Sequence, residues 1–146
     1  MAAAGAWVTH NLVKQKMAQK LIDFDNDVFV VRLYTSASDI NTVADSDASA
    51  ATNELTTANG YTAGGYTVAG VVTESAGTTK IDFADATWSA TGAGITARYA
   101  AIINTTLTPD EIIAHCELDA TPADVTAPSG NQFLVQIHSN GAIQLI

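Results

Sequence analysis

Short runs of β-branched and aromatic residues, separated by turn residues, recur along most of the chain. The runs are "DVFVVRLYTS" (27–36), "YTVAGVVTE" (66–74), "TKIDF" (79–83), "GITARYAAII" (94–103), "EIIAHCEL" (111–118), "QFLVQIH" (132–138) and "AIQLI" (142–146). Between the last two, "IHSNGAI" predicts a hairpin with Asn140-Gly141 as a type I′ turn. Such residues pack well on pleated sheets, and many short strands are typical of sandwiches and barrels. The sequence predicts a mainly β protein, an antiparallel β-sandwich or barrel of six to seven short strands with one N-terminal α-helix.

Alternation within two runs indicates which strand residues face a core. Ile81 and Phe83 enclose a polar residue and are predicted to be buried, because neighbouring side chains of a strand point to opposite faces. In the run 94–103, one face is predicted to carry Ile95, Ala97, Tyr99, Ala101 and Ile103, and the other Thr96 and Arg98. Continuing the first alternation puts residue 87 inward, so Trp88 reaches the core only if the chain shifts by one residue after Asp85. We predict that shift, with Trp88 packed near Tyr99.

The glycine-rich stretch "TTANGYTAGGYTVAG" (56–70) has two interpretations, a loop that cradles a phosphate or a set of turns between strands. A phosphate loop of the Walker type ends in Gly-Lys-Ser/Thr, but no lysine occurs between Lys20 and Lys80. A dinucleotide-binding G-x-G-x-x-G motif opens a helix, whereas β-branched residues follow here. We therefore interpret Asn59-Gly60 and Gly64-Gly65 as turn dipeptides.

Residues 9–22, "THNLVKQKMAQKLI", have the periodicity of a helix. Val13, Met17 and Leu21 recur at a spacing of four and form one apolar stripe. Thr9 or Asn11 is expected to cap the helix start.

The chain organisation follows from these elements. We expect a single domain, residues 1–146, because 146 residues are too few for two domains of ordinary size. An N-terminal basic arm and helix (1–22) precedes a β body (23–146). Within the body, residues 36–59 are small, polar and acidic and predict a long loop, ordered by contact with a partner subunit.

The net charge of −9 is unevenly distributed. Residues 1–22 carry Lys14, Lys16 and Lys20 and no acid, so this arm has a charge of +3 and the rest of the chain −12. An acidic body repels nucleic acid, because neutralising phosphates supplies most non-specific affinity. The arm either lies on an acidic surface, its own or a neighbour's, or is a solvated helix face.

Compartment signals are few. Cys116 is the single cysteine, which excludes an internal disulfide and a Cys-rich zinc site and fits synthesis in a reducing cytosol. "MAAAGAWV" lacks the basic start of a signal peptide. No apolar run approaches the roughly 20 residues that span a bilayer, so we expect no membrane partner.

Metal-binding patterns are incomplete. Asp23, Asp25 and Asp27 alternate like the start of a calcium loop, but the glycine and glutamate that such a loop needs are missing, so we interpret them as a charged turn. His115 and Cys116 are strand neighbours and point apart. His10 and His138 have no companion at ligand spacing. We expect no metal: none of these patterns is complete. We also expect no cofactor.

No pattern indicates an enzyme. A G-x-S-x-G nucleophile motif is absent, and "PSGN" (128–131) predicts a turn. Aromatic residues allow two interpretations, stacking on sugars or filling a core or an interface; they are Tyr61, Tyr66, Trp88 and Tyr99.

The segment "NELTTANGYTAGGYTVAGVVTESAGTTKIDFADATWSATGAGITARYAAII" (53–103) resembles a family of small bacteriophage virion proteins. Members share a run close to "NEV…GYTAGG", then "lDaddvtW", then "TARYAvvY". The matching residues are Asn53, Glu54, Gly60 through Gly65, Asp82, Asp85, Trp88 and Thr96 through Ala100. Weaker likeness extends to 20–36 and to the last strands, while "INTTLTPDEI" departs from the pattern. The resemblance implies that "NGYTAGGYT" is a paired turn leading into a sheet, where Gly64 and Gly65 adopt positive φ because a Cβ is costly there.

The resemblance also implies a function. We expect a non-enzymatic, multi-copy phage structural protein, a capsid decoration or cement protein on the outer shell of the virion, made in the bacterial host cytoplasm. Its expected partners are the major capsid protein and copies of itself. The predicted interface residues are Lys14, Lys16, Lys20, Tyr61 and Tyr66. Alternatives are a tail or neck protein, an adhesin that binds a host-surface glycan, and a small hydrolase.

Overall fold

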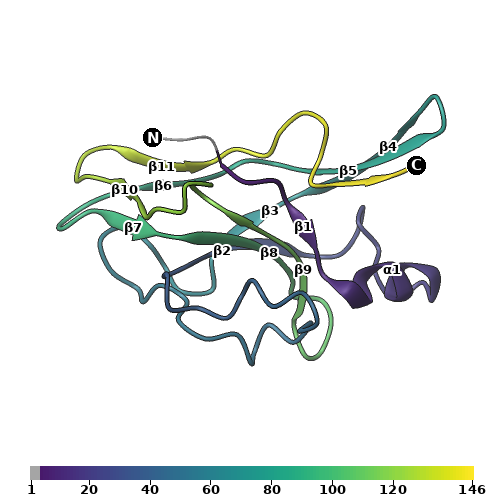
Figure 1. Ribbon diagram of the computed structural model, residues 1–146, viewed down its shortest axis with the longest axis horizontal. Coiled ribbons are helices and arrows are strands. Elements are labelled where there is room, and N and C mark those ends of the chain that lie inside the picture. Colours follow the sequence, from purple (N-terminus) through teal and green to yellow (C-terminus); the bar gives the residue numbers. More distant parts are fainter. Residues whose placement is uncertain (1–3) are drawn as a thin grey trace.

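A computed structural model of the chain describes residues 4–146 (Figure 1). In chain order the elements are β1 (Val8–Thr9), α1 (Asn11–Ala18), β2 (Phe29–Tyr34), β3 (Tyr66–Val68), β4 (Gly70–Ser75), β5 (Thr78–Phe83), β6 (Ala86–Ser89), β7 (Ile95–Ala97), β8 (Tyr99–Asn104), β9 (Glu111–Glu117), β10 (Val125–Ala127), β11 (Gln132–Val135) and β12 (Ile143–Leu145). All strand pairs are antiparallel. This mainly β, sandwich-like arrangement with one N-terminal helix confirms the predicted fold class.

The described residues form twelve strands, more than the predicted six or seven. Two predicted runs are divided, 66–74 at Ala69 and 94–103 at Arg98. In addition, β1, β6 and β10 lie outside the predicted runs. These three strands have two to four residues each, too short for a periodic pattern to be visible.

The largest sheet has the strand order β1-β9-β8-β2-β3, and its central strands β9, β8 and β2 are buried on both faces. β2 is apolar almost throughout, so alternate side chains need a packed layer on either side. Phe29, Val31 and Leu33 join one core cluster, while Val30 and Tyr34 join a second. The sheet is therefore the middle layer of the molecule.

Three small sheets cover the first face. Their strand orders are β12-β5-β4, β11-β6 and β10-β7. Ile81 of β5, Phe133 of β11 and Ile95 of β7 are buried in the first core cluster. Figure 1 shows β4, β5, β6 and β11 above β2, β8 and β9, with the loops of residues 36–59 below them.

Residues 36–59 cover the second face. Ile40 and Ala48 are buried against Ile103 and Ile112 in the second core cluster. The Ser38 hydroxyl donates to the Thr52 carbonyl at 2.6 Å, which closes the segment on itself. Contacts within the chain therefore hold the loop on the sheet, and the expected contact with a partner subunit stays a prediction.

Helix α1 is shorter than predicted, because β1 and a turn occupy the ends of 9–22. Val13 is fully buried and Met17 packs against the core, but Leu21 lies beyond the helix and is half exposed. The N-cap residue is His10, and its side chain makes no capping hydrogen bond. The predicted caps are wrong for this reason: Thr9 belongs to β1, and Asn11 is the first helical residue.

The glycine-rich stretch forms the predicted turns. Asn59 and Gly60 have φ of 55° and 94°, and Ala58 and Tyr61 exchange two backbone hydrogen bonds across them, as in a type I′ turn. Gly65 also has positive φ, and a Cβ there would lie 2.3 Å from the Val31 carbonyl oxygen. Gly64 has a φ of 99°, so the prediction that Gly64 and Gly65 both adopt positive φ is confirmed.

The predicted hairpin at Asn140-Gly141 is wrong. β11 pairs with β6, and β12 pairs with β5, so the two runs are not partners. The Gly141 N–H donates to the His138 carbonyl at 2.7 Å, and Gly141 alone of the turn residues has positive φ. The turn instead leads the chain from the sheet that contains β11 and β6 to the sheet that contains β12 and β5.

The burial of Trp88 is confirmed, but its predicted neighbour is not. β5 ends at Phe83 and β6 begins at Ala86, so the two-residue break shifts the inward positions to Ala86 and Trp88. Tyr99 instead packs against the second core cluster. The single face predicted for 94–103 is wrong for a related reason: the break at Arg98 sends Ile95 and Ala97 to the first cluster and Ala101 and Ile103 to the second.

Candidate functional site

Tyr61, a predicted interface residue, is 2% exposed and lies in the first core cluster. Its hydroxyl donates to Glu54 Oε1 at 2.8 Å and accepts the Leu33 N–H at 3.2 Å. The same Glu54 oxygen accepts the Gly64 N–H at 2.6 Å. Burial, the largest cause, raises the pKa of Tyr61. Tyr61 therefore joins the glycine-rich stretch to β2 from the inside and has no surface to offer a glycan or a partner.

Tyr66 is the exposed aromatic residue of this region, at 42%. Its ring meets the Trp88 ring edge-on, with centroids 5.8 Å apart. Trp88 itself is 6% exposed and also contacts Tyr61. Of Tyr61, Tyr66 and Trp88, therefore, Tyr66 is the residue whose ring is exposed enough to stack on a sugar.

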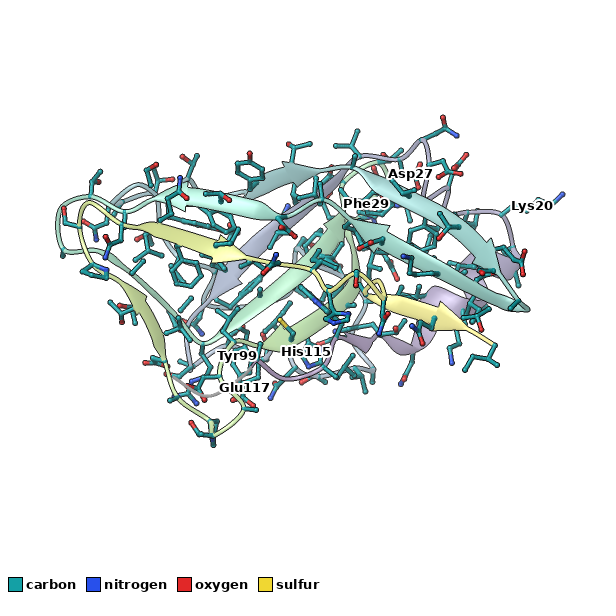
Figure 2. The ribbon with its side chains drawn as sticks, turned by 90° about the horizontal axis from the view of Figure 1, so that it is seen from above. Lys20, Asp27, Phe29, Tyr99, His115 and Glu117 are labelled. Atoms are coloured by element: carbon teal, nitrogen blue, oxygen red, sulfur yellow. The ribbon has the colours of Figure 1, made fainter. Side chains whose placement is uncertain are left out.

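The three arm lysines have different surroundings. Lys16 Nζ donates to Glu111 Oε2, and the Glu111 side chain is buried. Lys14 and Lys20 are exposed, and no ion pair within residues 4–146 includes them. Figure 2 shows Lys20 at one end of the molecule, pointing away from the body. Lys16 thus holds the arm on its own acidic body, and Lys14 and Lys20 remain available to a neighbour.

A buried histidine pair joins the arm to the sheet. His10 Nε2 lies 3.0 Å from His115 Nδ1, and the two rings meet edge-on. The exposed fractions are 1% for His10 and 7% for His115. The two histidines have no ligand spacing in the sequence, but β1 pairs with β9 and so brings together residues that lie 105 positions apart.

The contacts of the pair fix its protons. His10 Nδ1 lies 2.5 Å from the Asp45 carbonyl oxygen, which can only accept, so Nδ1 carries a hydrogen. Neutral His10 then accepts at Nε2, and His115 donates from Nδ1. Burial lowers the pKa of His115 to about 4, with the charge of His10 as the second cause. Burial also lowers the pKa of His10, against the Asp45 carbonyl and the Asp45 and Glu111 charges, which raise it.

The acidic segment Asp23–Asp27 forms the predicted charged turn. Asp23 Oδ1 accepts the N–H groups of Asp25 and Asn26, and the Asn26 side chain, the largest cause, lowers the pKa of Asp23. Within residues 4–146, no three or more His, Cys, Asp or Glu side chains are grouped to hold a metal. Cys116 lies in the first core cluster, away from the histidine pair, and burial raises its pKa to about 12.

An open apolar groove of about 750 Å³ runs beside the N-terminal arm. Residues 4–7 form one wall, and residues 116–118, β10, β11 and residues 136–144 contribute the rest, with Trp7, Leu118 and Phe133 among the lining side chains. Its lining holds no carboxylate, and Cys116 and His138 are its titratable groups. The groove therefore offers apolar contact and little acid–base chemistry.

No described helix, within residues 4–146, is long and apolar enough to cross a membrane. Comparison of the chain with protein-family models, with curated proteins and with solved structures found no match. An antiparallel β-sandwich-like fold carrying one basic helix is the class that the structure defines.

Proposed function

We propose that the chain is a non-enzymatic bacteriophage structural protein that decorates or cements the outer surface of a capsid. The proposal rests on the resemblance of residues 53–103 to small virion proteins. Several residues of that pattern have structural duties here: Gly60 completes a type I′ turn, Trp88 fills the core, and Asp85 Oδ1 accepts the Ile137 N–H at 2.9 Å. A pattern made of fold-determining residues suits a scaffold that needs no reactive group.

The exposed face of the arm is the proposed attachment surface. Lys14 and Lys20 project from an otherwise acidic protein, and their charges are not neutralised within the described chain. An exposed ion pair contributes about 0–1 kcal/mol, so one copy gains little from either lysine. Many copies on a symmetric shell, each held also by sister subunits, add these small terms together.

A density map of the virion that carries this protein tests the proposal. We expect repeated density of this fold over the outer shell, next to the major capsid protein. Density confined to the tail or the neck would favour the alternative virion role. Absence of the protein from purified particles would overturn both. Binding of a host glycan that is lost in Tyr66→Ala would favour an adhesin instead.

Charge reversal tests the attachment surface without damaging the fold. Deleting residues 1–22 would also remove Val13 from the core, so Lys14→Glu and Lys20→Glu are the sharper variants. Each is expected to lower occupancy on particles, most strongly at low salt, where charges are least screened. Lys80→Glu on β5 is the control for net charge, and because Lys80 Nζ donates to the Ser139 carbonyl, the Tm of this variant is measured beside its occupancy. Equal occupancy of all three variants and the wild type at every salt concentration would exclude the arm from attachment.

A further inference from the structure

We propose that His10 and His115 form an acid-sensitive contact that holds the N-terminal arm and loop 36–59 on the five-stranded sheet, and that acidification releases both. The inference goes beyond the proposed function and does not depend on it. It concerns how one surface of this fold opens.

The pair lies where three elements meet. From the arm, the His10 N–H donates to the Ile113 carbonyl of β9 at 3.0 Å. From the loop, the Asp45 carbonyl accepts the His10 ring N–H, and the Val43 carbonyl accepts the Asn11 backbone N–H. His115 is the β9 side chain that meets the His10 ring (Figure 2 labels it). A change at the His10 ring therefore acts on the arm, the loop and the sheet together.

Proton counting shows why the contact is sensitive to acid. One hydrogen lies between His10 Nε2 and His115 Nδ1, and the Asp45 carbonyl fixes a second hydrogen on His10 Nδ1. A first added proton is compatible with this arrangement, because one ring can still accept from the other. A second added proton makes both rings cationic, so two N–H groups face each other across 3.0 Å and the contact breaks.

Charged groups from each surrounding element act on the pair. Glu111 of β9 is buried, its Oε2 pairs with Lys16 of α1, and its Oε1 has no hydrogen-bond partner among residues 4–146. The loop contributes the Asp45 carboxylate, which together with Glu111 favours a charged His10. Asp47 of the loop forms a backbone bridge to Glu111. The Asp45 and Glu111 charges favour addition of the first proton to the pair, but they do not remove the repulsion between the two N–H groups after the second proton is added.

The direction of the pH effect follows from the lowered pKa values. A released histidine returns to its ordinary pKa of about 6.5, so the open form binds protons more readily than the closed form. The contact is at full strength above pH 6.5 and weakens as the pH falls toward about 4, the pKa of His115. In this range His115 raises the opening equilibrium by up to about tenfold per pH unit, and the lowered pKa of His10 acts in the same direction.

Release uncovers a specific surface. Loop 36–59 covers the second core cluster through Ile40 and Ala48. Opening the loop therefore exposes the face of β2 and β8 that carries Val30, Ala101 and Ile103. An apolar surface is hidden at neutral pH and offered at mildly acidic pH.

Native-state amide hydrogen exchange between pH 7.0 and 4.5, corrected for intrinsic rates, tests the proposal. Protection of residues 8–18 and 38–48 is expected to fall at least tenfold by pH 5.0, while protection of β2 and β8 falls less. In His115→Asn the amide nitrogen takes the place of Nδ1 but does not titrate, so the pH dependence of both segments is expected to flatten. His138→Asn, the same change at an exposed histidine, is expected to behave as the wild type.

Two results would overturn the proposal. One is protection of the arm and loop that does not change with pH. The other is an unchanged pH dependence in His115→Asn, which would assign the effect to carboxylates such as Asp45 and Glu111. If that variant does not fold, histidine ring titration of the wild type by NMR decides. Two rings that titrate below the ordinary histidine pKa of about 6.5 are expected, and titration of the His10 and His115 rings near 6.5 would contradict the inference.

Discussion

Replacing Trp88 by alanine tests the packing between the small sheets and the glycine-rich stretch. The Trp88 ring contacts Tyr61 and Tyr66, with centroids 5.6 and 5.8 Å away, and Phe133 at 6.3 Å. Phe133 is also its direct partner in the β6–β11 register. The variant therefore removes one side chain that holds three aromatic neighbours in place.

The expected cost is large because the site is closed. Truncating a buried tryptophan to alanine costs about 3–5 kcal/mol in lost transfer free energy and cavity formation. Trp88 is nearly fully buried, and its neighbours belong to paired strands and a tight turn, which limits collapse into the cavity. A domain has a total stability of about 5–15 kcal/mol. For a chain of this length the loss corresponds to a fall in Tm on the order of 10 °C.

Calorimetry or circular dichroism of the isolated protein measures this fall. Leu134→Ala is the matched control, because Leu134 lies next to Phe133 on the same strand but is half exposed. We expect its Tm to change by a small fraction of the Trp88→Ala shift. A Trp88→Ala protein that melts within about 2 °C of the wild type, well short of the expected fall, would show that Trp88 is not part of the core.

Three further predictions concern single contacts. Tyr61→Phe leaves the Leu33 N–H without its acceptor and is expected to cost about 1–3 kcal/mol in urea unfolding; no change in the midpoint would contradict that. Gly60→Ala places a Cβ 1.9 Å from the Ser89 carbonyl oxygen, whereas a Cβ at Gly64, which has a similar φ, meets no atom of the described chain within 4 Å. Gly60→Ala is therefore expected to lower the free energy of unfolding far more than Gly64→Ala, and equal effects would refute the steric argument. Cys116 is expected to resist a thiol reagent at pH 8 until the protein is unfolded in urea, because burial raises its pKa to about 12; rapid labelling of the native protein would contradict this.

Local chemistry explains what could be predicted from the sequence. The Asn59-Gly60 turn follows from φ preferences that act within four residues, and the structure has it. The run at 27–36 and the alternation of Ile81 and Phe83 follow from side-chain periodicity, which a strand expresses whatever its partner. The fold class could be predicted because it depends only on the number and spacing of such local signals.

Long-range pairing explains what could not. The residues after Gly141 were predicted to return along β11, but β12 pairs with β5, since the choice between partners depends on the whole sheet. His10 and His115 give no signal in sequence, because two single histidines at a separation of 105 residues match no ligand spacing. The burial of Tyr61 gives no signal in the sequence either, because composition cannot distinguish a core tyrosine from an exposed one.

Loop 36–59 shows how a polar segment can serve as a layer of a core. Its small side chains let the backbone approach the sheet, and Asp39 and Asp47 accept the N–H groups of Thr52 and Ser49 that the loop would otherwise leave unpaired. Each such hydrogen bond contributes about 1 kcal/mol net, and Ile40 is the one large apolar side chain among the loop residues of the second core cluster. Attachment of the loop therefore rests on several small terms. The contact between His10 Nδ1 and the Asp45 carbonyl is one of these terms, beside the backbone hydrogen bonds that join Ser46 to Ile112 and Ala48 to Asp110. Its loss on acidification therefore shifts the equilibrium of the loop toward the open form.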